Sequence, residues 1–312
     1  MTKTPAIAII GPTASGKTAL ALRIAKHVHG EIVNCDAFQV YRHMTIGTAK
    51  PTIAERQSIP HHMLDLHDPC DPFSAGQYQR LARKALKEIR GRGNTAIVAG
   101  GSGLYIKALI DGFFQGPGRS EELRNRMGRI VQRRGAASLY RALKRVDPKG
   151  AERISEPDTS RIIRAYEIYL LTGKPMSFWQ CQPRDELKDF RWLKIGIQWP
   201  REVLYQRINR RVDTMIRLGL CEETKCLMES FARTCHAFKA IGYRQIADYL
   251  EGRCGLEEAI EDTKRESRRY AKRQLTWFRS DPEIQWLEGT NQLDELFSCV
   301  CSLWKGFAAG VD

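Results

Sequence analysis

Residues 11–18, with the sequence GPTASGKT, restrict the possible folds of this 312-residue chain more than any other segment. They fit the pattern G-x-x-x-x-G-K-[ST] of a phosphate-binding loop, which needs a buried strand before it and a helix after it. The apolar run at residues 5–10 predicts the strand, and residues 19–28 have a helical pattern. The sequence therefore predicts an α/β fold in which backbone N–H groups and a helix N-terminus hold a phosphate group.

Each part of this loop has an expected task. Its glycines let the backbone wrap around a phosphate, Lys17 brings a full charge to it, and Thr18 offers a hydroxyl to Mg²⁺. A chance glycine-rich turn is the alternative, and the strand–loop–helix setting argues against it. The predicted diphosphate-binding residues are Gly11, Pro12, Thr13, Ala14, Ser15, Gly16, Lys17 and Thr18.

The strand expected at residues 95–99 limits what the loop binds. An ATPase carries an acidic residue at the end of such a strand to hold Mg²⁺. Here the strand is followed by Gly100, Gly101, Ser102 and Gly103, with no carboxylate. This favours a loop that grips a leaving or transferred diphosphate over a molecular motor or switch.

Strand and helix patterns alternate along the first third of the chain, which predicts a parallel sheet with helices on both faces. From residue 119 the pattern becomes helical and rich in arginine, and no strand is expected before residues 192–199. We therefore predict a phosphate-loop catalytic core formed by residues 1–118 and 192–312. Residues 119–191 are expected to form an inserted, all-helical domain.

Asp36 ends the second predicted strand, at residues 31–35. Ligands bind at the carboxyl ends of the strands in such sheets, so Asp36 should lie near the group held by the loop. A carboxylate there is placed to accept a proton from an attacking hydroxyl or amine. A turn-forming or helix-capping aspartate is the alternative, and position alone does not separate the two. Gln39 is a candidate for contact with a base edge.

The charge balance favours a polyanionic partner. Lys and Arg number 50 against 36 Asp and Glu, a net charge of +14, which attracts polyanions. Part of the excess lies at residues 264–278, within a helix predicted from residue 256 to about residue 278. For its aromatic residues Tyr270, Trp277 and Phe278 we expect packing in the core, with base stacking as the alternative. Further arginines cluster at residues 119–134 and 207–217. A plain solvated surface is the alternative for many of them.

The cysteines and the hydropathy indicate a cytoplasmic protein. The longest N-terminal apolar run, residues 6–10, is too short to span a bilayer or to form a signal peptide. The nine cysteines lack the spacing of zinc sites. We therefore expect reduced thiols and no metal cluster.

Several separated motifs then carry a resemblance to a known family. They are GPTASGKT (11–18), DAFQVYR (36–42), IGTAKP (46–51), GGSGLY (100–105), RIIRA (161–165), GKPMS (173–177), IGYRQ (241–245) and RYAKRQLTW (269–277). Together they resemble the bacterial tRNA dimethylallyltransferases, also called tRNA isopentenyltransferases, over nearly the whole chain.

The resemblance implies an activity. The family transfers a dimethylallyl group from dimethylallyl diphosphate to N6 of the adenosine just 3′ of the anticodon. Its substrates are tRNAs that read codons beginning with U. It implies Mg²⁺ as cofactor, dimethylallyl diphosphate and the tRNA anticodon stem-loop as partners, and a monomer. By the same resemblance, residues 119–191 would grip the anticodon stem-loop.

The resemblance also implies roles for individual residues. Asp36 resembles the family's general base, Arg211 an arginine on the diphosphate, and Ser102 a hydroxyl position where the family usually has threonine. The implied tRNA-contacting residues are Asp36, Ala37, Phe38, Gln39, Ser102, Arg124, Ser160, Arg161, Ile162, Ile163, Arg164, Ala240, Ile241, Gly242, Tyr243, Arg244 and Gln245.

Three residues depart from the family pattern. Ala37 replaces a usual serine, Ser160 a usual glutamine and Ser102 a usual threonine. We expect these departures to affect the tRNA preference and the rate but not the type of reaction, because Asp36, Lys17 and Thr18 are unchanged. Three alternatives share the phosphate loop: a small-molecule or nucleotide kinase, a prenyltransferase acting on free adenylate, and a non-catalytic RNA-binding protein. The kinase does not explain the helical insertion or the basic helices.

Overall fold

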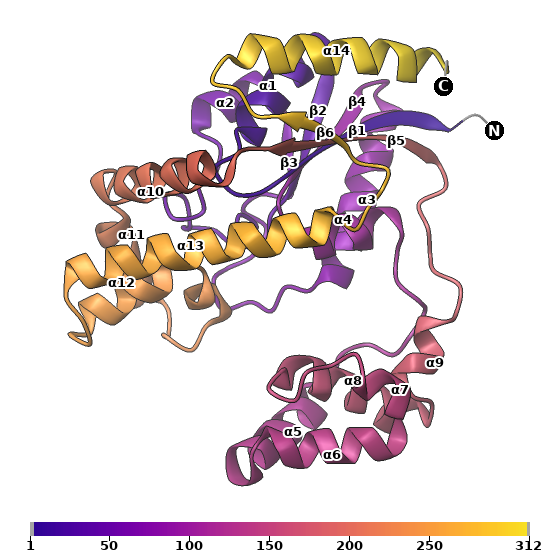
Figure 1. Cartoon of the computed structure of the whole chain (residues 1–312), viewed down its shortest axis with the longest axis vertical. Helices are drawn as coiled ribbons and strands as arrows, with labels where there is room; N and C mark the ends of the chain where they lie inside the picture. Colours follow the sequence, from indigo (N-terminus) through magenta and orange to yellow (C-terminus); the bar gives the residue numbers. More distant parts are fainter. Residues whose placement is uncertain (1–2, 311–312) are drawn as a thin grey trace. The chain divides into compact units, whose positions relative to one another are not determined.

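The computed structural model describes residues 3–310, which form two compact units (Figure 1). The core unit comprises the described residues up to Ile110 and from Leu187 onward. The helical unit comprises Asp111–Glu186. None of the described helices combines the length and the apolar character needed to cross a membrane.

A six-stranded parallel sheet forms the centre of the core unit, in the order β3-β2-β4-β1-β5-β6. The strands are β1 (Thr4–Ile10), β2 (Gly30–Cys35), β3 (His61–His62), β4 (Thr95–Gly100), β5 (Phe190–Gln198) and β6 (Gln285–Glu288). The predicted parallel sheet is confirmed. The sequence analysis did not predict β3, because two residues are too few to show a strand period.

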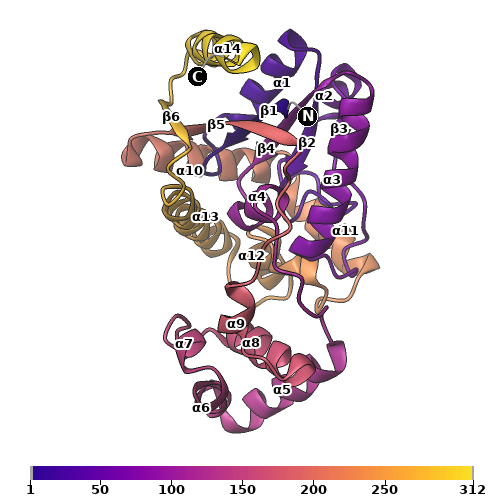
Figure 2. The same cartoon turned by 90° about the vertical axis from the view of Figure 1, so that its right-hand side faces the viewer.

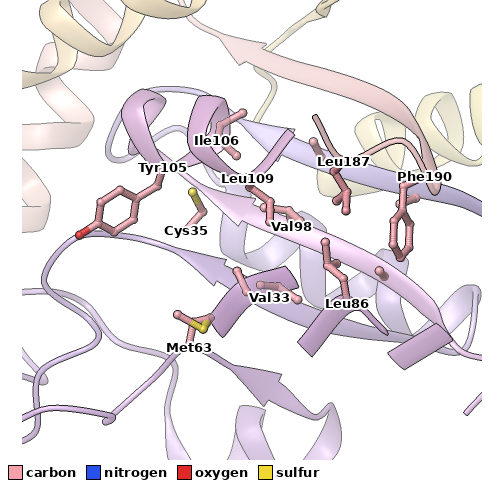
Figure 3. Close-up of a cluster of buried hydrophobic side chains, with 14 of the residues drawn as sticks. Val33, Cys35, Met63, Leu86, Val98, Tyr105, Ile106, Leu109, Leu187 and Phe190 are labelled. Carbon is pink, nitrogen blue, oxygen red and sulfur yellow. The ribbon is translucent and has the colours of Figure 1, made fainter. Parts of the chain in front are cut away.

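Helices cover both faces of this sheet. The helices of the core unit are α1 (Lys17–His27), α2 (Ile53–Ser58), α3 (Ala75–Gly91), α4 (Gly103–Ile110), α10 (Arg201–Arg217), α11 (Leu220–Ser230), the 3₁₀ helix η1 (His236–Lys239), α12 (Tyr243–Leu250), α13 (Leu256–Phe278) and α14 (Leu293–Ala309). Side chains alternate along a strand, so neighbouring residues of β1 enter different layers. Ala8 packs toward α3 and α4, in the cluster that includes Leu86 and Leu109 (Figure 3). Ile9 packs toward α1 and α14, which lie side by side (Figure 2).

The helical unit has a small core of its own. Its helices are α5 (Glu121–Arg134), α6 (Ala136–Val146), α7 (Pro148–Ala151), α8 (Thr159–Thr172) and α9 (Met176–Gln180). Met127, Leu143 and Ile162 are buried together between α5, α6 and α8. Buried Asp147 starts α7 by accepting from Gly150 N at 2.8 Å, and it also accepts from Ser177 N at 2.9 Å.

The compact helical unit spans residues 111–186, whereas the sequence analysis placed the insertion at residues 119–191. Its end lies earlier because Leu187 and Phe190 are buried in the hydrophobic cluster of the core unit. Leu187 N also donates to Ile110 O at 2.9 Å, so the chain re-enters the core unit where it left it.

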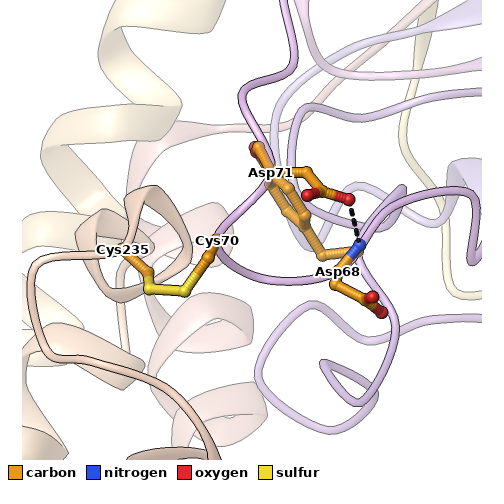
Figure 4. The surroundings of a disulfide bond; sticks show 5 residues. Asp68, Cys70, Asp71 and Cys235 are labelled. Atoms are coloured by element: carbon orange, nitrogen blue, oxygen red, sulfur yellow. Dashed lines mark hydrogen bonds between the residues drawn. A yellow bond between two sulfur atoms is a disulfide. The ribbon is translucent and has the colours of Figure 1, made fainter.

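Two cysteines are paired, which corrects the expectation that all nine are free thiols. Cys70 and Cys235 form a disulfide between segments 165 residues apart (Figure 4). The other seven cysteines are free. Sequence spacing gave no indication of the pair, because the fold alone brings these two loops together: Ala237 N donates to Pro69 O at 3.3 Å beside it.

Candidate active site

A pocket of about 330 Å³ lies within the core unit, where the phosphate loop meets the ends of β2 and β4. Its wall includes Thr13, Lys17 and Thr18 from the phosphate loop and the start of α1. It also includes Asp36 after β2 and Arg211 from α10. The fold thus brings together residues that are distant in the sequence, such as Thr13 and Arg211, which lie 198 positions apart. This is the crevice that parallel α/β sheets offer to ligands at their strand ends.

Side chains from outside the phosphate loop fix it by donating hydrogen bonds to its carbonyl oxygens. Trp199 Nε1 donates to Ser15 O at 3.0 Å, and Arg207 Nε donates to Ala14 O at 3.0 Å. The Arg207 guanidinium lies 4.2 Å from the centre of the Trp199 ring. Gly11 has φ +145°, and a Cβ there would lie 2.8 Å from Ile197 O. These contacts fix the loop, and loops of this kind bind anions through their backbone N–H groups.

The inner side of the loop is strongly cationic. Lys17 Nζ donates to Pro12 O at 2.6 Å. Burial lowers the pKa of Lys17 from 10.5 to about 7; the Arg211 guanidinium acts in the same direction, and the Asp36 carboxylate opposes both. Burial likewise lowers the pKa of Arg211, against the effect of Asp36. A bound polyanion would favour the charged forms of Lys17 and Arg211, because it adds negative charge to that of Asp36.

We expect pyrophosphate binding to take up protons through Lys17 above neutral pH. At about pH 8.5 the free site holds a mostly neutral Lys17, and the bound anion favours its charged form, so close to one proton enters. At about pH 6 Lys17 is already charged, and its share vanishes. Calorimetry in buffers of different ionisation enthalpy measures the uptake. Lys17→Met is the control for protons taken up by pyrophosphate itself, and equal uptake by both proteins at the higher pH would contradict the prediction.

Asp36 combines the two roles that the sequence left open. Its Oδ1 accepts from Phe38 N at 2.9 Å and from Gln39 N at 3.3 Å, which forms a turn after β2. Its Oδ2 has no hydrogen-bond partner among the described residues, and the side chain lines the pocket. One oxygen therefore fixes the carboxylate, and the other is left to accept a proton from a ligand.

Ser102 lies next to this wall. The pocket is lined by Gly100 and Gly101, which precede it. Ser102 N donates to Cys35 O at 3.2 Å, and its carbonyl accepts from Tyr105 N and Ile106 N at 3.0 Å, so it begins α4. The structure thus places Ser102 beside Asp36 along the sheet edge, one residue beyond the lining.

The predicted residues of segments 36–39 and 240–245 divide between the pocket and the core. Phe38, Gln39, Ala240 and Ile241 line the pocket. Tyr243 is fully buried, and its hydroxyl donates to Glu223 Oε1 at 2.5 Å. Of the remaining members, Ala37 is half-buried, Arg244 is exposed, and Gly242 and Gln245 are buried. Gln245 caps α12 by accepting a hydrogen bond from Gly242 N at 3.0 Å. For Tyr243 and Gln245 the described contacts are those of a scaffold.

Glu223, the partner of Tyr243, also binds the backbone at residues 45–47. Its carboxylate accepts from the backbone N–H groups of Thr45, Ile46 and Gly47 at 2.9–3.3 Å. These residues belong to the segment that continues into pocket-lining Thr48, Ala49 and Pro51. The carboxylate and Tyr243 therefore hold one wall of the pocket in place.

The other predicted tRNA-contacting residues belong to the helical unit. Arg124 and Arg164 both pair with Glu167, which is fully buried, at 2.7–3.0 Å. Burial opposes ionisation of Glu167, but hydrogen bonds from Arg124 and Arg164 outweigh it and keep its pKa below the usual value. Ile162 is buried and Ile163 half-buried, whereas Ser160 and Arg161 are exposed. Ser160 and Arg161 are therefore the members of this set most open to a partner.

Helix α13 contributes more to the pocket than the sequence analysis predicted. Ser267, Tyr270, Arg273 and Gln274 line the pocket. The expectation that its aromatics pack in the core holds for Phe278 alone. Tyr270 lines the pocket, where burial and the Asp36 charge raise its pKa, and Trp277 is 39% exposed beside Gly103. Tyr270 and Trp277 lie on the face of α13 that packs against the ends of the strands. A helical period shows that such a face is apolar, but it does not show whether the face meets the core or a pocket wall.

Comparisons with known proteins identify the family of this chain. The family model described as IPP transferase matches residues 39–281. The tRNA dimethylallyltransferase of Koribacter versatilis is 48% identical over 282 residues, covering 90% of this chain and 92% of that protein. That of Geobacillus thermodenitrificans is 46% identical over 286 residues, covering 91% and 90%.

Solved structures give the same result. The tRNA isopentenylpyrophosphate transferase of Bacillus halodurans matches with a TM-score of 0.71 and 40% identity, covering 97% of each chain. A eukaryotic dimethylallyltransferase acting on tRNA matches with a TM-score of 0.85 and 27% identity, covering 99% of this chain and 81% of that one. The chain therefore belongs to the IPP transferase family.

Proposed function

We propose that this chain transfers a dimethylallyl group from dimethylallyl diphosphate to N6 of the adenosine just 3′ of the anticodon, releasing diphosphate. The substrates are tRNAs that read codons beginning with U. The observation that carries the proposal is that Asp36, Lys17 of the phosphate loop and Arg211 of α10 line the same pocket. The names of the relatives point to the same prenyl transfer to tRNA.

The reaction needs both halves of the pocket. An exocyclic adenine amine is a weak nucleophile because its lone pair is delocalised into the ring, so it needs a base. In the proposed mechanism Asp36 Oδ2 accepts the N6 proton as the C–N bond forms. Lys17, Arg211 and loop N–H groups stabilise the negative charge of the departing diphosphate. The apolar side chains of Val212 and Met215, on the same wall as Arg211, are suited to the prenyl group.

The residues present fit an Mg²⁺ ion bound together with the diphosphate. Mg²⁺ prefers oxygen ligands and is held by few protein groups besides substrate phosphates. Thr18 and Asp36 both line the pocket, and the buried Oε1 of Gln39, another lining residue, has no hydrogen-bond partner among residues 3–310. We assign Thr18 as the protein ligand of the ion. When bound, the ion supplies positive charge to the leaving group.

The adenosine must leave the stacked anticodon loop to reach Asp36, which costs a few kcal/mol. Stacking on protein side chains, worth about 1–3 kcal/mol per base, offsets part of this cost. Phe38 and Tyr270 are the aromatic rings on the pocket wall. All residues assigned to the reaction come from one chain, so we assign one chain to each tRNA. We place the reaction in the cytoplasm, where tRNA is modified.

Mass spectrometry of nucleosides tests this function. The protein is incubated with unmodified tRNA, Mg²⁺ and dimethylallyl diphosphate, and the tRNA is then digested. N6-isopentenyladenosine at one position per tRNA is the expected product. Phosphate transfer from ATP without tRNA would instead support a kinase, and prenylation of free AMP in place of tRNA would support an adenylate prenyltransferase.

Arg161→Ala is expected to weaken tRNA binding several-fold and to leave dimethylallyl diphosphate binding unchanged. The Arg161 side chain is 68% exposed and pairs only loosely with Asp158, at 3.4 Å. Loss of one phosphate contact should also reduce the salt slope of binding by about 1. Filter binding at several salt concentrations measures both.

Arg145→Ala is the matched control for Arg161→Ala. It removes one exposed arginine from the same unit, at a position that is not among the residues individually predicted to contact tRNA. An equal loss of tRNA affinity in the two variants would show a general charge effect and count against a specific role for Arg161.

A further inference from the structure

Gln274 is the buried residue that joins two walls of the pocket. It lies on α13 and is 6% exposed. Its Oε1 accepts from Thr13 N in the phosphate loop at 2.9 Å. Its Nε2 donates to Gly101 O, after β4, at 2.8 Å. One side chain from a distant helix thus connects the loop that follows β1 with the loop that follows β4.

The second connection leads directly to the candidate base. Ser102, the next residue after Gly101, donates its N–H to Cys35 O at 3.2 Å. Cys35 precedes Asp36. The phosphate loop is therefore linked to the residue before Asp36 through Gln274 and a single backbone step. These contacts connect the loop expected to bind the leaving group with the backbone that precedes the candidate base.

The chemistry of the contact requires an amide. Thr13 N needs an acceptor and Gly101 O needs a donor, and a glutamine carries one of each. A glutamate would place an oxygen against Gly101 O and add a negative charge beside the diphosphate site. Gly101 is constrained by the same contact, because a Cβ there would collide with Gln274 Nε2.

We propose that Gln274 is a positioning residue that sets the spacing between the diphosphate cradle and Asp36. This inference rests on the proposed prenyl transfer, and it gives Gln274 a role in addition to those proposed for Lys17, Arg211 and Asp36. A mis-spaced pocket still binds each substrate separately but brings the reacting atoms together less often, and small errors of position cost large factors in rate.

Two variants and one control test the proposal. Gln274→Met keeps the side-chain volume and removes both hydrogen bonds. Gln274→Glu keeps the acceptor and removes the donor. Thr276→Ala, on the exposed face of the same helix, removes a hydrogen bond to Lys272 O. The measurements are the single-turnover rate at saturating tRNA and dimethylallyl diphosphate, the Kd of pyrophosphate, the Kd of tRNA, and the Tm.

For Gln274→Met we expect the single-turnover rate to fall about 10–100-fold, because a misplacement of reacting groups by about 1 Å can cost about 10²-fold in rate. Its Kd for pyrophosphate should rise by less than the rate falls, and its Kd for tRNA should not change. For Gln274→Glu both rate and pyrophosphate affinity should fall, since the added charge repels the anion. The Thr276→Ala variant should match wild type in all four measurements.

Gly101→Ala gives an independent check on the same contact. It displaces Gln274 from the other side, so the Gly101→Ala/Gln274→Met double variant should be about as slow as the slower single variant. Additive losses would mean that the two residues act separately and would overturn the proposal. A wild-type single-turnover rate in Gln274→Met, or a loss confined to Tm, would overturn it as well.

The pyrophosphate measurement separates this inference from the proposed function. It needs neither tRNA nor the prenyl donor. If wild-type protein makes no prenylated tRNA, the proposed function fails, and a higher pyrophosphate Kd in the uncharged Gln274→Met variant against an unchanged Kd in Thr276→Ala still supports the bridge. If wild-type protein is active and both Gln274 variants match it, only the bridge fails.

Discussion

Replacing Asp36 by asparagine is expected to lower the rate of prenyl transfer about 10²–10⁴-fold, the usual contribution of a general base. The physical reason is that an amide cannot take the N6 proton at neutral pH. The substitution is nearly isosteric, and asparagine Oδ1 can still accept from Phe38 N and Gln39 N, which keeps the turn after β2. Single-turnover kinetics at saturating substrates measure the loss.

The affinities distinguish a lost base from a damaged pocket. Asp36→Asn should retain tRNA binding within about two-fold and should bind pyrophosphate at least as tightly, because a negative charge near the anion has been removed. Asp36→Glu should recover part of the rate. A rate near that of wild type in Asp36→Asn would remove this residue from the mechanism.

Replacing Lys17 by methionine is expected to reduce turnover by about 10³-fold, comparable with the loss of one preorganised electrostatic contact to a developing charge. Methionine keeps much of the side-chain volume and removes the charge that meets the leaving group. The pyrophosphate Kd should rise strongly, since Arg211 and backbone N–H groups alone then hold the anion. Steady-state kinetics and calorimetry measure the two effects, and unchanged pyrophosphate binding would contradict them.

The stability of the unliganded protein provides a control on the same variant. The pKa of Lys17 in the folded protein, about 7, lies below 10.5. The unfolded chain therefore binds more protons between these values, and the charged lysine penalises the fold fully below pH 7 and not at all above pH 10.5. Wild-type stability should gain from this group as pH rises through that window. Lys17→Met should lack the gain and should melt higher than wild type near neutral pH without ligand.

Local patterns were sufficient for the core of the fold. Residues 5–10, 31–35 and 95–99 were predicted as buried strands, and the structure places β1, β2 and β4 at Thr4–Ile10, Gly30–Cys35 and Thr95–Gly100. A parallel strand buried on both faces leaves a continuous apolar run that is visible in the sequence. The phosphate loop was equally visible, because its glycines and lysine act within eight consecutive residues.

Arg124 and Gln274 show where sequence reasoning stopped. Both lie in arginine-rich helices, and a charge pattern does not tell which side chains face solvent. Arg124 is committed to buried Glu167, 43 positions away, and Gln274 to Thr13, 261 positions away. Partners so distant have no shared period, so only the packed structure identifies them.

The sequence by itself determined that a strand, an anion-binding loop and a helix follow one another, and that a carboxylate ends the next strand. These are properties of short segments whose backbone conformation depends on their own residues. The sequence also predicted that Asp36 lies near the phosphate loop. The tertiary structure alone decided that α10 brings Arg211 to the same pocket wall, that Cys70 meets Cys235, and that Gln274 bridges two loops. Such contacts depend on how whole helices pack against the sheet, and that packing sums many weak interactions that no single segment encodes.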